Sequence, residues 1–224
     1  MARISSGFLP AITLGLAATV LHASSANAQQ DMGRVPRFEI TPFAGYQWGG
    51  SFDTDALGNI LAGELEENDG YHWGLTLSFL VPYGNSALEL IYLRQDTDIT
   101  FRPNAGSSFD VGEFANNYIH IGGRFEAMVE RPIRPFLTFS LGANIMDPKI
   151  ANVDSDTHFS WALGGGVKAM FSKNMGFRAD IRWWTTPVPS GDYGTWCDYW
   201  GCYAVEGTAW VNQGQLGAGL IFQF

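Results

Sequence analysis

Apolar and polar residues alternate with a period of two along most of the chain. The alternation is clearest in residues 175–183, where every odd position is apolar and the even positions include Arg178, Asp180 and Arg182. Seven further segments follow the same rule, some of them more weakly: 37–48, 71–79, 87–101, 119–127, 134–146, 159–171 and 210–224. Such alternation is typical of a β-strand with one apolar and one polar face. The pattern therefore predicts about eight strands.

The connections between these segments alternate strictly between short and long. The short ones are residues 81–86, 131–135 and 172–174, and the long polar ones lie near 49–69, 102–113, 147–157 and 185–207. Short turns at one end and long loops at the other are typical of a bacterial outer-membrane barrel, whereas a β-sandwich spreads its loop lengths more evenly. We therefore predict an all-β fold, an eight-stranded antiparallel up-and-down transmembrane β-barrel over residues 37–224.

Aromatic residues gather at the two ends of the predicted strands. The tryptophans at the long-loop ends are Trp48, Trp73, Trp161, Trp183 and Trp210. The phenylalanines at the short-turn ends are Phe38, Phe79, Phe136, Phe171, Phe177 and Phe224. Two such girdles, separated by aliphatic side chains, match the two interfaces of a bilayer.

Composition excludes several other classes of protein. Charged residues make up 16% of the chain, below the roughly 25% of ordinary soluble domains, while 27 glycines and 14% aromatics are high. Thirteen Lys and Arg against 22 Asp and Glu give a net charge of −9, which argues against a nucleic-acid partner. A mean hydropathy of −0.02 argues against a helical-bundle membrane protein, and the apolar content argues against disorder.

The first 28 residues have the pattern of a cleaved secretory signal peptide. Arg3 supplies a positive charge, residues 8–21 are largely apolar, and Ala26-Asn27-Ala28 forms an A-x-A cleavage site. A membrane anchor fits less well, because the apolar stretch is too short to span a bilayer. We expect a mature chain that begins at Gln29, with residues 29–36 as a short periplasmic segment before the barrel.

Two C-terminal segments resemble a known family. Residues 161–168 and 176–183 look like the penultimate hairpin of small outer-membrane β-barrel proteins, which include OmpA-type membrane domains, OmpX and the opacity proteins. The ending Gly219-Leu220-Ile221-Phe222-Gln223-Phe224 resembles the signal read by the barrel-assembly machinery, although Gly217 departs from the family pattern. The resemblance implies an outer-membrane site and assembly through that machinery, but no single activity.

The strand face opposite the apolar one carries a balanced set of charges. Its four acids and four bases are Glu39, Glu89, Arg124, Glu126, Lys168, Arg178, Asp180 and Arg182, with His72 and His120 on the same face. An eight-stranded barrel is just wide enough for side chains or one small ligand. Because unpaired buried charges are costly, we favour a closed, salt-bridged lumen; a narrow conduit is the alternative.

Cys197 and Cys202 are the two cysteines, and both lie in the last long loop among aromatic residues. In an oxidising compartment a local disulfide is the natural interpretation. A metal site would need two further ligands, and none stands nearby at suitable spacing. We expect no cofactor.

The first long loop is acidic and has a partial calcium-binding pattern. Asp53, Asp55 and Glu64 occupy positions one, three and twelve of an EF-hand loop, but Leu57 stands at a ligand position and the flanks predict strands. A solvated acidic loop is the simpler interpretation, with looser divalent-cation binding as the alternative.

His158 and Ser160 form a His-x-Ser pattern near the start of a predicted strand. Outer-membrane lipid A deacylases carry a similar pattern, in which the histidine activates the serine. Here Trp161 stands where that family has Asn, and no acid follows at a useful distance. Two polar residues of a lumen-facing row would look the same.

These observations favour a non-catalytic barrel with a structural or surface-interaction role. The alternatives are a narrow channel for small solutes and a lipid A-modifying enzyme that uses His158 and Ser160. The expected partners are outer-membrane lipids and lipopolysaccharide, the assembly machinery during insertion, and an unidentified molecule at the cell surface.

Overall fold

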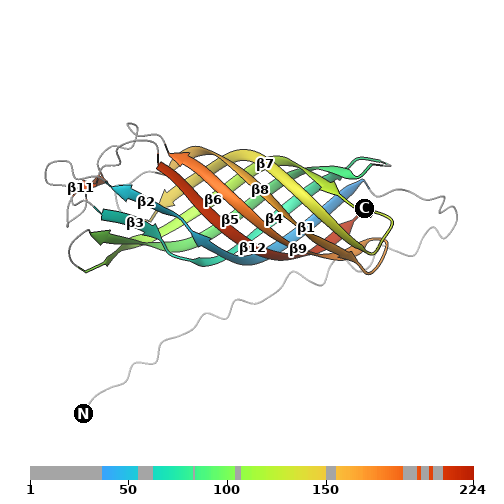
Figure 1. The fold of residues 1–224 in the computed structure, drawn as a ribbon, viewed down its shortest axis with the longest axis horizontal. Helices are drawn as coiled ribbons and strands as arrows, with labels where there is room; N and C mark the ends of the chain where they lie inside the picture. Colours follow the sequence, from blue (N-terminus) through green and yellow to red (C-terminus); the bar gives the residue numbers. More distant parts are fainter. Residues whose placement is uncertain are drawn as a thin grey trace, which may run out of the picture. The chain divides into compact units, whose positions relative to one another are not determined.

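Eight long strands form a closed antiparallel barrel (Figure 1). The computed structural model of the chain describes residues 37–54, 63–82, 84–103, 107–149, 155–188, 196–197, 202–203 and 209–224. The barrel strands are β1 (Phe38–Gly49), β4 (Gly70–Leu80), β5 (Ser86–Pro103), β6 (Phe109–Glu126), β7 (Ile133–Pro148), β8 (Asp156–Met170), β9 (Met175–Val188) and β12 (Ala209–Gln223). The predicted fold class is confirmed.

The barrel closes where the first strand meets the last. β1 pairs with β12 and β4, and the pairing of β5 with β6 completes the ring. At the short-turn end the Phe224 amide donates to the Phe38 carbonyl at 2.9 Å, and the Arg37 amide donates to the Phe224 carbonyl at 2.9 Å. The terminal residue of the chain therefore belongs to the seam between β1 and β12.

The long-loop end contains more strand structure than the sequence predicts. β2 (Ser51–Thr54) and β3 (Gly63–Glu67) form a hairpin within the first loop, and β3 pairs with the end of β5. β10 (Trp196–Cys197) and β11 (Cys202–Tyr203) form a separate two-stranded ribbon in the last loop. Within the described residues, no helix is long and apolar enough to cross a membrane.

Most of the segment 102–113, which we predicted to be a loop, belongs to β5 and β6. The register shifts between Ile99 and Thr100, and Gly112 has a φ of 154°, a conformation that side-chain-bearing residues rarely adopt. An extra residue in one strand reverses the apolar–polar alternation beyond it. Because of this irregularity, the first residues of β6 do not continue the period-two pattern of the rest of the strand.

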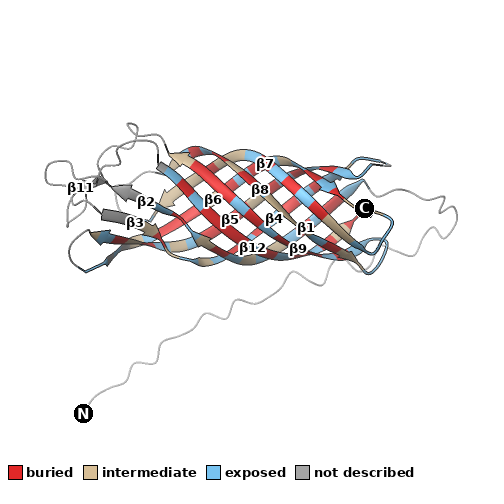
Figure 2. Cartoon of the chain, viewed as in Figure 1, coloured by how far each residue is buried: buried red, intermediate tan, exposed pale blue. Residues whose placement is uncertain are grey.

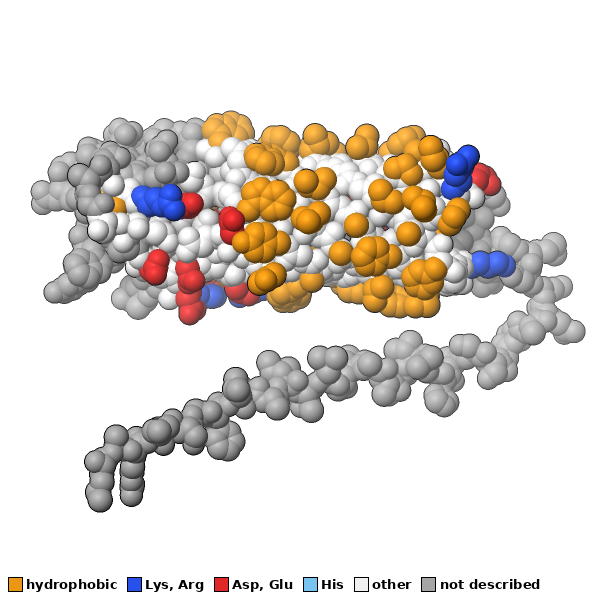
Figure 3. Space-filling model, turned by 60° about the horizontal axis from the view of Figure 1, so that its bottom comes forward, with side chains coloured by type: hydrophobic (Ala, Val, Ile, Leu, Met, Phe, Trp, Pro, Cys, Tyr) orange, Lys and Arg blue, Asp and Glu red, His pale blue; other side chains and the backbone are white. Residues whose placement is uncertain are grey.

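The two faces of the barrel wall have opposite character. Along each strand, exposed and buried residues alternate (Figure 2). On the face seen in Figure 3, exposed apolar side chains cover the middle of the barrel, and charged side chains lie toward the two ends. The exposed apolar residues include large side chains such as Leu137, Ile121 and Leu216, each more than half exposed. A wall with apolar residues outside and polar ones inside suits a lipid environment.

The aromatic girdles are present, with one correction. Trp73, Trp183 and Trp210 are about half exposed on the outer wall near the long-loop end. Phe136, which we predicted for the opposite girdle, is instead only 4% exposed and faces the lumen. Its neighbour Leu137 occupies the outward position on β7, so Phe136 has the inward parity of that strand.

Candidate functional site

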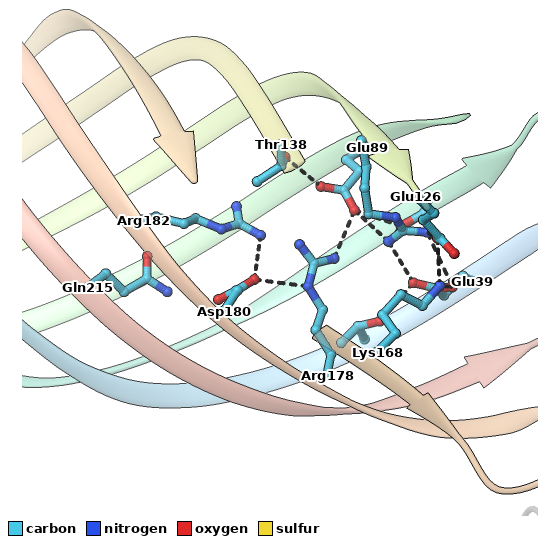
Figure 4. A network of polar contacts seen from close by, with 12 residues as sticks. Glu39, Glu89, Glu126, Thr138, Lys168, Arg178, Asp180, Arg182 and Gln215 are labelled. Carbon is cyan, nitrogen blue, oxygen red and sulfur yellow. Dashed lines mark hydrogen bonds and ion pairs between the residues drawn. The ribbon is translucent and has the colours of Figure 1, made fainter. Parts of the chain in front are cut away.

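Charged side chains from five strands meet inside the barrel toward the short-turn end (Figure 4). We call the eight residues predicted for the lumen the ion network. Arg124 lies at its centre: Nη1 is 2.8 Å from Glu39 Oε1 and 2.7 Å from Glu89 Oε1, and Nη2 is 2.8 Å from Glu126 Oε1. One guanidinium therefore links carboxylates from β1, β5 and β6.

The other three bases extend the ion network in two directions. Lys168 Nζ lies 2.6 Å from Glu39 and 2.9 Å from Glu126. Toward the middle of the barrel, Arg178 lies 2.8 Å from Glu89 and 2.9 Å from Asp180. Asp180 Oδ2 also accepts from Arg182 Nη2 at 3.0 Å. The structure thus brings all eight predicted residues into one connected set.

Neutral side chains complete the contacts of the carboxylates. Thr138 donates to Glu89 at 3.2 Å, and Gln223 donates to Glu39 at 2.9 Å. The guanidinium of Arg178 lies 4.5 Å from the ring centre of Phe136, within cation–π range. Phe136, which we predicted for the outer girdle, thus packs beside the ion network.

The ion network carries no net charge and is closed to solvent. Its side chains are at most 8% exposed. A buried ion pair adds little net stability, but removal of one partner leaves an uncompensated charge that costs about 3–5 kcal/mol. Loss of a single member of the ion network is therefore expected to be costly.

On the long-loop side of the ion network, aromatic and histidine side chains fill the middle of the barrel. We call Tyr118, His120 and Trp184, together with His72, the aromatic layer. The Trp184 ring lies 4.6 Å from that of Tyr118 and 4.8 Å from that of His120, measured between centres. Trp184 Nε1 donates to Gln215 at 2.6 Å, and the Gln215 amide lies 3.1 Å from His72 Nε2.

Small residues next to His72 make room for its ring. A Cβ at Gly217 would lie 3.2 Å from Asp180 Oδ1 and 3.6 Å from His72 Nε2, and one at Gly45 would lie 2.8 Å from His72 Cε1. Gly217 is the position at which the C-terminal segment departs from the family pattern. A larger side chain there would crowd the polar ends of Gln215 and Asp180.

The structure pairs Ser160 with His120 rather than with His158. His120 Nε2 lies 2.5 Å from Ser160 Oγ, and its Nδ1 lies 3.1 Å from Ser140 Oγ. His158 and Ser160 share a face as predicted, but that face is the lumen, and Ser160 is 0% exposed. The hydroxyl therefore points away from the lipid-facing wall.

Toward the long-loop end, five buried amides line the lumen. We call them the amide belt: Gln47, Gln95, Asn116, Asn144 and Gln213. Gln47 Nε2 donates to Gln213 Oε1 at 2.8 Å, and Asn144 Nδ2 donates to Asn116 Oδ1 at 3.1 Å. Tyr118 also donates its hydroxyl to Gln213 Oε1. The belt thus connects directly to the aromatic layer.

Glu67 is a buried acid beside the amide belt. It lies in β3, outside the eight barrel strands, and its Oε1 accepts from Asn116 Nδ2 at 2.5 Å. Burial raises the pKa of Glu67 to about 8, and hydrogen bonds from Gln213 and Asn116 act in the opposite direction. Burial therefore makes ionisation of this carboxyl group unfavourable.

The amide belt shows what the sequence reasoning missed. Gln47 and Glu39, and Gln95 and Glu89, are separated by even numbers of residues, so the parity that identified the charges also applies to these amides. Glu67 carried no such signal, because the β2–β3 hairpin folds it back against the barrel.

The remaining predicted sites lie at the long-loop end. Backbone pairing places Cys197 opposite Cys202, and Asp53 opposite Glu64 in the β2–β3 hairpin. A paired hairpin is not the helix-flanked loop of an EF-hand. Asp55 and the signal-peptide residues lie outside the described residues. Within the described part of the chain, no group of three His, Cys, Asp or Glu residues could hold a metal ion.

The residues of the predicted assembly signal lie in the barrel seam. Phe224 is 67% exposed on the outer wall at the short-turn end. Phe222 pairs with Ile40 on one side and with Met175 on the other. A Cβ at Gly219 would meet the Pro42 carbonyl oxygen at 2.5 Å, so the backbones of β12 and β1 approach closely there.

Comparisons with known proteins agree with this geometry. The family model described as "Outer membrane protein beta-barrel domain" matches residues 13–222. Among solved structures, the chain is similar to Neisserial surface protein A, with a TM-score of 0.54, 15% identity and coverage of 84% of this chain and 97% of the other. It is also similar to OprG from Pseudomonas aeruginosa, with a TM-score of 0.57, 8% identity and coverage of 84% and 97%. A third match is AlkL in lipid bilayers, with a TM-score of 0.55, 11% identity and coverage of 89% and 96%. No curated protein sequence matches the chain.

Proposed function

The chain belongs to the outer membrane protein β-barrel domain family, and we propose that it is a non-catalytic barrel with a closed lumen. The family implies an outer-membrane location. In this proposal the barrel is a rigid support, and the strands and loops at the long-loop end are the parts that meet molecules outside the cell. The fold alone does not assign a role, and the filled lumen is the feature that supports this one.

The observation that carries the proposal is the continuous filling of the lumen. The ion network, the aromatic layer and the amide belt follow one another along the barrel, and their side chains are buried. Arg124 and Arg178 each bridge carboxylates from different strands. A solute would have to break several buried ion pairs to pass, which is unfavourable because each leaves an uncompensated charge.

The route to the membrane is part of the same proposal. Residues 1–28 act as a cleaved signal peptide, and residues 29–36 remain as a periplasmic segment. The assembly machinery recognises the ending with Phe222 and Phe224, and the mature barrel contacts phospholipid and lipopolysaccharide. A Cys197–Cys202 disulfide fixes the last loop, which is supported by their opposite positions in the β10–β11 ribbon.

The two alternatives have less support. A narrow channel requires a continuous polar path, and the aromatic layer interrupts the lumen between the ion network and the amide belt. A lipid A-modifying enzyme requires a serine that can reach lipid, and Ser160 is buried on the inner face.

Conductance across a planar bilayer tests the closed lumen. We expect the refolded wild-type protein to give no steady current, because the ion network carries no net charge and leaves no open path. Arg178→Ala removes a bridge between Glu89 and Asp180 and should produce intermittent leak currents. Arg134→Ala, near the periplasmic turn, is the control and should give no current. Steady wild-type conductance would overturn the proposal and favour the channel.

A further inference from the structure

Several buried polar atoms of the amide belt have no hydrogen-bond partner. Among the described residues, Gln47 Oε1, Gln95 Oε1 and Asn144 Oδ1 are buried and have no hydrogen-bond partner. All three side chains are 0% exposed. A buried polar atom without a hydrogen-bond partner is unfavourable, so a set of three oxygens requires an explanation.

Three of the five amide nitrogens of the belt donate hydrogen bonds, and those of Gln95 and Gln213 have no partner. Gln47 and Asn144 direct their nitrogens to other amides, and Asn116 directs its nitrogen to Glu67. A Cβ at Gly50 would lie 3.1 Å from both Glu67 Oε2 and Gln213 Nε2, so these two groups border the same space. Asn116 and Gln213 are thus the belt residues next to the acid. The three free oxygens belong to their neighbours, because Gln47 contacts Gln213, Asn144 contacts Asn116, and Gln95 pairs with Asn116 across β5 and β6.

An ionised Glu67 has no cationic partner within this region. Among the described residues, no Lys, Arg or His forms an ion pair with Glu67, whereas its neighbour Glu66 pairs with Arg102 at 2.6 Å. Every acid of the ion network has at least one cationic partner. Buried carboxylates are normally paired or bound to a cation.

We propose that the amide belt and Glu67 together bind one alkali-metal ion, such as Na⁺ or K⁺. Carbonyl oxygens can replace the hydration shell of such an ion, as they do in potassium-selective pores. Gln47, Gln95 and Asn144 supply three carbonyl oxygens, and Glu67 supplies the carboxylate. A single positive charge balances Glu67, whereas a divalent ion would leave a net charge buried in the lumen.

The site explains how the β2–β3 hairpin is held against the barrel. Glu67 is the last residue of β3, and its amide donates to the Gly50 carbonyl at 2.7 Å. The next residue, Asn68, donates its amide to the Asp98 carbonyl at 2.9 Å. An ion held between Glu67 and the belt residues of β1, β5 and β7 would fix the base of the hairpin.

Thermal unfolding of the purified full-length protein tests this site. The refolded barrel is heated in detergent in alkaline buffer, where Glu67 is ionised, with NaCl, KCl or choline chloride at equal ionic strength. We expect the Tm to rise with Na⁺ or K⁺ concentration and to saturate, while choline, a bulky quaternary ammonium ion that carbonyl oxygens do not coordinate closely, gives no specific rise. Equal Tm values in all three salts would overturn the proposal and indicate that water alone occupies the belt.

Two variants locate the ion. Glu67→Gln keeps the shape of the side chain and removes its charge, so the difference between Na⁺ and choline should disappear. Glu113→Gln, at an exposed position on β6, is the matched control and should retain the difference. If Glu67→Gln retains it, the ion is bound elsewhere and the proposal is wrong.

A third variant distinguishes weaker ion binding from a general folding defect. Gln95→Leu removes one carbonyl oxygen without changing the charge, and Gln95 has no hydrogen-bond partner to lose. We expect the concentration of Na⁺ at half-saturation to rise about tenfold, which corresponds to about 1.4 kcal/mol. An unchanged half-saturation would show that the belt oxygens do not contact the ion.

Discussion

At the scale of single residues, the inward parity of a strand determined most of the lumen. The eight charged residues that parity predicted for the lumen all lie inside the barrel, because side chains of a strand alternate between two faces. The same rule could not say which residues touch. Ser160 meets His120 of another strand rather than His158 two residues away, since barrel closure and strand tilt set contacts across the lumen.

The stability of the barrel should depend strongly on Arg178. Arg178→Ala leaves Glu89 and Asp180 each without one cationic partner, and we expect a loss of about 3–5 kcal/mol. Lys173→Ala, in the exposed β8–β9 turn, should cost about 1 kcal/mol or less. Urea unfolding of both variants in detergent, followed by tryptophan fluorescence, gives the comparison. Equal losses would mean that the buried network does not stabilise the fold.

Loss of Ser160 should affect stability and leave lipids unchanged. Ser160→Ala removes a hydrogen-bond partner of buried His120, which costs about 1–3 kcal/mol. Mass spectrometry of lipid A from cells that express the wild type, Ser160→Ala or His158→Ala should give the same acylation pattern. An acyl chain removed only in the presence of the wild type would support the enzyme alternative.

At the scale of elements, alternation and loop length located all eight barrel strands but not their outer ends. β5 and β6 continue together to Pro103 and Phe109, beyond the region where lipid imposes an apolar outer face. There Asp98 and Glu113 stand opposite each other on the exposed side, so the apolar signal is lost while the backbone pairing continues. The β2–β3 hairpin was missed for the same reason.

The end of β12 should determine whether the barrel assembles. Phe224 contributes backbone hydrogen bonds to Arg37 and Phe38, and its ring is exposed at the periplasmic edge. Deletion of Phe224 removes both the hydrogen bonds and the ring, whereas Phe224→Ala removes the ring alone. We expect both variants to reach lower levels in the outer membrane, with the deletion more severe, as measured by heat-modifiable migration in membrane fractions.

A matched substitution separates the assembly signal from general hydrophobicity. Phe171→Ala removes an equally exposed ring at the same end of the barrel, in the β8–β9 turn. It should leave the outer-membrane level close to that of the wild type. If Phe171→Ala and Phe224→Ala lower the level equally, the position of the ring at the C-terminus has no special role.

At the scale of the whole molecule, the asymmetry of the connections predicts the orientation of the barrel. Outer-membrane barrels place short turns in the periplasm and long loops outside the cell. The structure keeps this asymmetry: the β8–β9 turn spans residues 171–174, while residues 189–208 separate β9 from β12. The amide belt and the β2–β3 hairpin would therefore face the exterior, and the ion network would lie nearer the periplasm.

Cysteine labelling on intact cells tests this orientation. In a background with Cys197 and Cys202 changed to serine, Ser107→Cys lies at an exposed position between β5 and β6, and Asn174→Cys lies at an exposed position in the β8–β9 turn. A membrane-impermeant maleimide should label the first in intact cells and the second only after the outer membrane is opened. Labelling of Asn174→Cys in intact cells, with protection of Ser107→Cys, would reverse the orientation and place the amide belt on the periplasmic side.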